Sequence, residues 1–284
     1  MADTSEGPGE APAGTPAGWT LGSVMAFFAL TVLLTTPFWL LSAMTKVELL
    51  PGLPIAAAAV VCPAAAAFIL TCRRGGLSAG GRLLAGALDA GRIRAKAWWL
   101  PLVLLSPCVT IATFLVMRLG GSPIPDPQFA PLEAAALFLL FLISALAEEL
   151  GWSGFAIGPL QARWGALPAA LVVGAVWAVW HYPALAQAHR SLAWIGWWTL
   201  ATVATRVIIV WLFNNAGRSV FAAALFHAMT NLGWQLYPVH GSWFDPRLNG
   251  LILAAVALAV VLLWGPATLN SSPARRAAGR RAAG

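Results

Sequence analysis

Long runs of apolar residues recur along the chain and constrain the fold more than any other feature of its sequence. They occupy 19–44, 53–72, 97–117, 132 onward, 167–185, 192–213, 220–236 and 251–264. A helix that crosses a bilayer needs about 20 such residues, and lipid offers no hydrogen-bond partner to backbone outside helices or closed barrels. With 60% hydrophobic and 10% charged residues, the chain is therefore predicted to be an all-α, polytopic transmembrane helical bundle of about eight spans.

The two ends of the chain differ in composition from the apolar part. Residues 1–18 are rich in Ala, Gly and Pro and carry no Lys or Arg. They therefore predict a disordered N-terminal tail rather than a secretory signal, which begins with basic residues. Residues 265–284 carry arginines among small residues and predict a basic cytoplasmic tail. The transmembrane helical domain is expected to cover 19–264.

Basic residues are distributed unequally between alternate connections of the predicted bundle. Twelve Lys and Arg residues lie in 73–96, at 163 and 218 and in the C-terminal tail, whereas four lie in the opposite connections, at 46, 118, 190 and 247. The positive-inside rule then places both termini in the cytoplasm and the protein in the cell membrane. The net charge of the chain is +7, and its basic residues adjoin apolar segments. We therefore expect these residues to contact anionic lipids and not nucleic acid. Apolar residues at helical spacing within 73–96 favour an interfacial helix there.

Two adjacent carboxylates, Glu148 and Glu149, follow the apolar run that begins at 132. A carboxylate at membrane depth costs about 2.5–3.5 kcal/mol on insertion scales, so a pair that stays in a span is a candidate for function. A kinked continuation of this span as far as 163 is compatible with its glycines. The alternative is that both glutamates lie beyond the helix end, in headgroups or water.

Three further polar residues, His181, His227 and Asn231, lie inside later apolar runs. If the fourth and fifth spans form a hairpin, helix rise places Glu149 and His181 at a common depth, about 23–24 Å from the turn. Asn231 then lies about 21 Å and His227 about 15 Å from the following turn. Taken singly, each residue is compatible with an ordinary packing or hydrogen-bonding role between helices. Their convergence with two carboxylates predicts a single site.

Two kinds of chemistry are open to such a group. Zinc could bind through Glu148, His181 and His227, although the HExxH spacing is absent. Without metal, a carboxylate and a histidine could activate water, while the second histidine and Asn231 donate hydrogen bonds to an oxyanion. We expect the reaction to use no cofactor, and the residue pattern leaves zinc open. Both routes lead to hydrolysis of a carbonyl compound within the bilayer, with a peptide bond as the expected substrate.

The polar residues resemble three motifs of the CAAX prenyl endopeptidase family, also called the CPBP or ABI intramembrane proteases. Those motifs are EExxxR, FxxxH and HxxxN/B, and the resemblance covers about 132–231. Their counterparts here are Glu148-Glu149 with Trp152, Trp177 to His181, and His227 to Asn231.

The resemblance implies a role for each residue. Glu148 would activate water together with His181, and Glu149 would be the supporting carboxylate. His227 and Asn231 would form the oxyanion hole. The implied protein is an intramembrane endopeptidase acting on a membrane-embedded or membrane-anchored peptide or protein.

Two residues depart from the family motifs. Ser153 replaces the arginine of the first motif and Trp177 the phenylalanine of the second, a mild exchange between aromatic residues. Without the arginine, the second glutamate loses its expected counter-charge. This favours an alternative: a non-catalytic relative that binds and regulates a membrane protein. Arg206, which lies inside an apolar run, could pair with Glu149 instead, or could extend towards the membrane surface.

Overall fold

The computed structural model describes residues 19–45, 47–50, 53–128 and 130–270. The predicted tail 1–18 and residues 271–284 of the predicted C-terminal tail lie outside this part of the chain. The helices are α1 (Leu21–Met44), η1 (Ile55–Val61), α2 (Cys62–Ala85), η2 (Gly86–Arg92), η3 (Lys96–Trp98), α3 (Trp99–Leu119), α4 (Pro131–Gly151), η4 (Trp152–Ala156), α5 (Ile157–Trp164), α6 (Ala166–Gln187), α7 (Leu192–Asn215), α8 (Val220–Leu236) and α9 (Pro246–Trp264). Two short strands, β1 (Glu48–Leu50) and β2 (Leu53–Pro54), form an antiparallel ribbon.

The predicted all-α polytopic bundle is confirmed. Among the described residues, 7 helical segments are long and apolar enough to cross a membrane. The remaining predicted span corresponds to α8, which has only 17 residues. At about 1.5 Å per residue, α8 is about 25 Å long, less than the hydrocarbon core of about 30 Å. Helix α8 nevertheless carries the chain back from the end of α7 to the start of α9, and its N-terminal half is buried among other helices.

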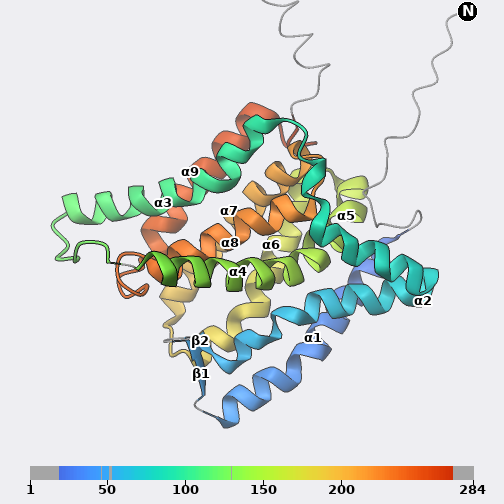
Figure 1. The fold of residues 1–284 in the computed structure, drawn as a ribbon, viewed down its shortest axis with the longest axis horizontal. Coiled ribbons are helices and arrows are strands. Elements are labelled where there is room, and N and C mark those ends of the chain that lie inside the picture. Colours follow the sequence, from blue (N-terminus) through green and yellow to red (C-terminus); the bar gives the residue numbers. More distant parts are fainter. Residues whose placement is uncertain (1–18, 46, 51–52, 129, 271–284) are drawn as a thin grey trace, which may run out of the picture.

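The central helices carry the residues of the predicted site, and the outer helices cover them. Helix α7 packs against α6 and α9, and α8 packs against α4 and α3. Helices α1 and α2 lie on one flank, below α4 in Figure 1, while α3 and α9 lie on the opposite flank. Apolar side chains of α9 face outward, as expected for contact with lipid, whereas most of α7 is enclosed by protein.

The fourth span continues through a change of helix type, as its glycines suggested. Helix α4 passes into one turn of π-helix, η4, and then into α5, so the segment Pro131–Trp164 is 34 residues long. Glu148 and Glu149 lie within α4 with 3% and 0% of their surfaces exposed. The alternative that they lie beyond the helix end is therefore wrong. A Cβ at Gly151 would lie 2.7 Å from the Pro63 backbone oxygen, so glycine is what lets α4 approach α2 closely here.

Two features were not predicted from the sequence. Helix α2 runs through the start of the basic segment 73–96 and is interrupted at Gly76, whose φ is +71°. The packed structure also extends past the predicted boundary at 264: Leu269 is fully buried. The side chains of Asn214 and Asn215 donate hydrogen bonds to the backbone oxygens of Thr268 and Leu269, which holds this segment against the end of α7.

Candidate active site

Glu149 is the most completely hydrogen-bonded of the predicted site residues. Its Oε2 accepts from Arg206 Nη1 at 2.7 Å and from the hydroxyl of Ser153, and its Oε1 lies 3.1 Å from His227 Nδ1. The donors come from α7, η4 and α8, so this one carboxylate joins three parts of the bundle. A buried carboxylate with this many donors is stabilised in its ionised form.

Arg206 pairs with Glu149, as predicted from the sequence. Its side chain is fully buried, so the alternative that it extends to the membrane surface is wrong. The guanidinium carbon lies 4.3 Å from the centre of the Trp177 ring, a distance suited to a cation–π contact. The Nε and Nη2 atoms have no hydrogen-bond partner among the described residues. The arginine is therefore held by one charge-assisted hydrogen bond and one aromatic face.

Glu148 faces a cavity of about 550 Å³, whereas Glu149 is not among the residues that line it. Glu148 Oε2 accepts hydrogen bonds from Trp177 Nε1 at 2.8 Å and from Trp152 Nε1 at 3.3 Å. Its Oε1 has no protein partner in the described part of the chain. Because adjacent residues on a helix point about 100° apart, the two carboxylates can face different surroundings. One oxygen of Glu148 is thus held in place while the other can meet a water molecule or substrate.

His181 lines the same cavity, and its ring is fixed at one edge. Its Nδ1 lies 2.8 Å from the backbone oxygen of Trp177. A carbonyl oxygen can only accept, so Nδ1 carries the hydrogen and Nε2 of the neutral ring keeps its lone pair. The ring lies against those of Trp177, Trp180 and Trp198, with centroids 5.7, 4.7 and 5.3 Å away. His181 can therefore accept a proton or hydrogen bond through Nε2.

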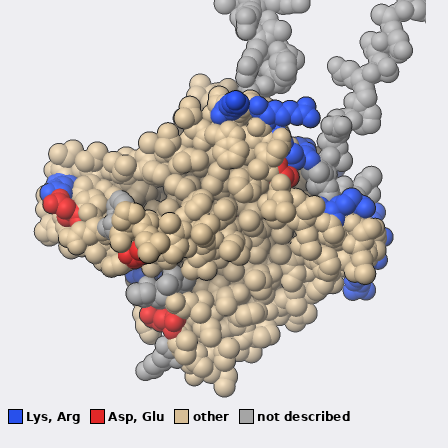
Figure 2. Space-filling model, in the orientation of Figure 1, with Lys and Arg blue, Asp and Glu red and all other residues tan. Residues whose placement is uncertain are grey.

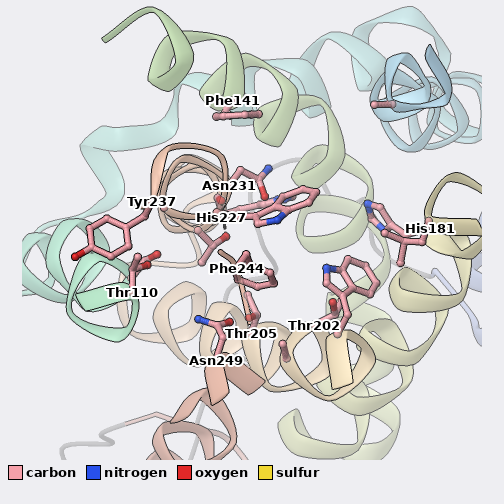
Figure 3. A pocket seen from close by; sticks show the side chains of 18 of the residues that line it. Thr110, Phe141, His181, Thr202, Thr205, His227, Asn231, Tyr237, Phe244 and Asn249 are labelled. Carbon is pink, nitrogen blue, oxygen red and sulfur yellow. Dashed lines mark hydrogen bonds between the residues drawn. The ribbon is translucent and has the colours of Figure 1, made fainter. Parts of the chain in front are cut away.

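His227 and Asn231, one turn apart on α8, also line this cavity. Figure 3 shows them with Phe141 of α4 above and Thr202 and Thr205 of α7 below. His227 Nδ1 faces Glu149 Oε1, and an ionised carboxylate only accepts, so Nδ1 is again the protonated nitrogen. His227 Nε2 therefore donates only when the ring is an imidazolium, whereas the Asn231 amide can always donate.

The structure thus brings four of the five predicted residues, Glu148, His181, His227 and Asn231, to one cavity and places Glu149 directly behind it. The Rce1-like family model, described as type II CAAX prenyl endopeptidase Rce1-like, matches residues 130–233. This range contains all five residues. CAAX prenyl protease 2 of Methanococcus maripaludis is 28% identical over 168 residues. Residues 130–233 of this chain are thus similar to the CAAX prenyl endopeptidase family.

The similarity to this relative covers only part of each protein. The alignment spans 55% of this chain and 62% of the Methanococcus maripaludis protease, so the chain spans less than two thirds of the relative's length. Within the matched range, Arg206 of α7 places a positive charge beside Glu149, as was expected of the arginine that the first motif lacks here. Ser153, which stands at that motif position, instead donates its hydroxyl to Glu149.

The described residues do not form a ready metal site. No group of three or more His, Cys, Asp or Glu side chains among them lies close enough together to hold a metal ion. Both histidines use Nδ1 for protein contacts and keep Nε2 as the remaining ring nitrogen, an arrangement that metal-ligating histidines also show. Zinc needs three or four ligands converging on one point, and its binding through Glu148, His181 and His227 stays a prediction from the sequence.

Trp177 has a larger role than its sequence indicated. The exchange of the family's phenylalanine for tryptophan was interpreted as mild, but the indole N–H donates to Glu148, a contact that phenylalanine cannot make. The same ring contacts Arg206 and lies with its centroid 4.9 Å from that of His227. The polar lining of the cavity from α7, including Thr202 and Thr205, had no local sequence signal at all.

Proposed function

We propose that this chain is an intramembrane endopeptidase of the CAAX type that hydrolyses a peptide bond without a metal ion. The observation that carries the proposal is the arrangement around the cavity: Glu148 and His181 each present a proton acceptor, and Asn231 presents an amide donor. Glu148 is buried and His181 and Asn231 are half-buried, which strengthens each interaction because fewer water molecules compete for these groups.

The proposed reaction begins with a water molecule between Glu148 and His181. Glu148 Oε1 takes one proton from the water while His181 Nε2 accepts the other hydrogen in a hydrogen bond, and the water oxygen bonds to the carbonyl carbon of the peptide. General-base assistance of this kind typically contributes about 10²–10⁴-fold to the rate. The proton held by Glu148 then passes to the leaving nitrogen as the C–N bond breaks.

Negative charge develops on the carbonyl oxygen in this step. Asn231 donates an amide hydrogen to it, and His227 donates from Nε2 when its ring is protonated. Glu149 stabilises that imidazolium through Nδ1, and Arg206 in turn keeps Glu149 ionised. Loss of a single oxyanion donor in other hydrolases costs about 10²–10³ in turnover, so Asn231 and His227 are expected to matter individually.

The alternative, a non-catalytic relative that regulates a membrane protein, was motivated by the missing motif arginine. Since Arg206 pairs with Glu149, that reason no longer favours it over the enzyme. We further propose a location in the cell membrane with both termini cytoplasmic and with anionic lipids against the basic end of the bundle. The substrate would be a membrane-embedded or membrane-anchored peptide or protein.

The proposal can be tested with the purified full chain in detergent and a library of membrane-anchored peptides. Parent protein should cleave members of the library, and Glu148→Gln, which keeps the shape of the side chain, should not. A thermal unfolding curve for Glu148→Gln close to that of the parent would exclude misfolding as the cause. Parent-like cleavage by Glu148→Gln would rule out the general-base role, and absence of cleavage by the parent would favour the regulatory relative.

A further inference from the structure

The cavity that contains the candidate site is bounded at one end by connections on a single side of the bundle. Its outer lining comes from the β1–β2 ribbon and from the α3–α4, α6–α7 and α8–α9 connections. Six residues mark this mouth: Leu49, Pro54, Ile124, Arg190, Pro238 and Asp245.

The opposite end of the cavity is closed by packed side chains. Phe155, Phe213 and Phe226 are at most 2% exposed and belong to the buried core beyond the Glu149–Arg206 pair. Among the described residues, none from 62–105 or from the turns at 165 and 216–219 lines the cavity. Substrate can therefore reach Glu148 from the mouth but not from the closed end.

The two ends of the bundle carry very different charge. In Figure 2, Lys and Arg gather at the right and upper right, and the left end carries acidic side chains beside few basic ones. Eight basic residues and one acid, Asp89, lie at the closed end among the described residues: Arg73, Arg74, Arg82, Arg92, Arg94, Lys96, Arg163 and Arg218. Three basic and four acidic residues lie at the mouth end: Arg118, Arg190, Arg247, Glu48, Asp126, Glu133 and Asp245.

The positive-inside rule assigns the basic end to the cytoplasm. From this charge asymmetry and the single mouth, we propose that the site receives its substrate from the non-cytoplasmic face of the membrane. The proposal rests on the proposed endopeptidase function and adds the side from which the peptide enters. It excludes cytoplasmic chain ends as substrates and indicates segments of exported or membrane-anchored proteins that lie at the outer surface.

The lining also indicates the chemistry of the segment. Apart from Glu148 and the two histidines, its charged members are only Arg190 and Asp245, both at the mouth. The rest is apolar, aromatic, hydroxyl-bearing or amide-bearing, so a charged side chain drawn inside would lose its hydration without a partner. The geometry points to an uncharged, largely apolar stretch in an extended conformation.

The depth of the site sets how far this stretch must enter. His181 lies six residues before the end of α6 at Gln187, and His227 nine before the end of α8 at Leu236. At about 1.5 Å per residue these positions are about 9–14 Å below the helix ends. Because an extended peptide advances about 3.3 Å per residue, the two histidines lie about three to four peptide residues below these helix ends.

The sidedness of the mouth can be measured with cysteine labelling. In a background with Cys62, Cys72 and Cys108 replaced by alanine, Ser242→Cys reports the mouth end and Leu88→Cys, at an 83% exposed position, the basic end. A membrane-impermeant maleimide added to intact cells should label Ser242→Cys and leave Leu88→Cys unlabelled until the membrane is opened. The reverse pattern would overturn the proposal.

A second measurement needs no cysteine variant. A quenched fluorescent decapeptide of neutral, mainly apolar residues, with a charged group at one end to prevent crossing, is added to right-side-out or inverted vesicles that contain the parent chain. Cleavage above the Glu148→Gln background is expected in right-side-out vesicles only, and in both after detergent. Cleavage only in inverted vesicles would refute the outward-facing site and leave the endopeptidase function intact. No cleavage even in detergent, by the parent, would count against the function itself.

Discussion

Removing the guanidinium of Arg206 is the perturbation whose effect follows most directly from the structure. Arg206 is fully buried and pairs with Glu149 at 2.7 Å. Arg206→Ala would leave the carboxylate with Ser153 and His227 as donors and no full positive charge beside it when His227 is neutral. Breaking a buried ion pair on one side typically costs about 3–5 kcal/mol. Part of this loss in unfolding free energy comes from the contact between the guanidinium and Trp177, since a desolvated cation–π pair contributes about 2 kcal/mol.

Matched variants separate charge from packing. Arg206→Met fills most of the same volume without the charge, so its loss of unfolding free energy reports the ion pair with little contribution from a cavity. In a cycle with Glu149→Gln, the double variant should lose less stability than the two single losses combined, by at least about 1 kcal/mol. Unfolding of the purified protein in mixed micelles measures these free energies, and peptide cleavage measures activity in the same preparations.

The activity of Arg206→Ala should also fall, because Glu149 orients His227 at 3.1 Å. Placing an arginine at the motif position in the same variant, Arg206→Ala with Ser153→Arg, should recover part of both losses, since residue 153 already contacts Glu149. Substitutions at neutral surface positions change the free energy of unfolding by less than about 0.5 kcal/mol. If the unfolding free energy of Arg206→Met differs from that of the parent by no more than this, the ion pair does not stabilise the protein as proposed.

Three further outcomes follow from the same structure. Trp177→Phe restores the family's aromatic residue but removes the hydrogen-bond donor to Glu148. The variant should lose about 1.5–3 kcal/mol in unfolding free energy, measured in micelles, or in transition-state free energy, measured from kcat. Equal values for variant and parent would contradict the role given to the indole N–H. Gly151→Ala would press a methyl group against Pro63 and should destabilise by about 1–3 kcal/mol in thermal unfolding, with little change at the exposed Gly81→Ala used as control. Cleavage should survive dialysis against a chelator, and activity that disappears with EDTA and returns with stoichiometric zinc would reverse the metal-free proposal.

The similar depth of the site residues could be inferred from the sequence because helix rise is regular. Counting from expected turns placed Glu149, His181 and Asn231 at comparable levels, and the structure brings α4, α6 and α8 together around one cavity. The pairing of Arg206 with Glu149 was also predictable, since a buried charge requires a partner and few were available. The predicted run 220–236 coincides with α8, although its 17 residues are fewer than the roughly 20 that a membrane span needs.

The fold class, the resemblance to the CAAX endopeptidase family and the five polar residues could all be predicted from the sequence, because hydropathy and motif spacing are local properties of the chain. The packing of the helices had to be known before one could say which carboxylate faces the cavity, which nitrogen of each histidine is free, and that Trp177 joins Glu148, Arg206 and His227. These depend on helix rotation and on contacts between residues up to 78 positions apart. No local pattern specifies such contacts, because packing of whole helices against one another sets the direction in which each side chain points.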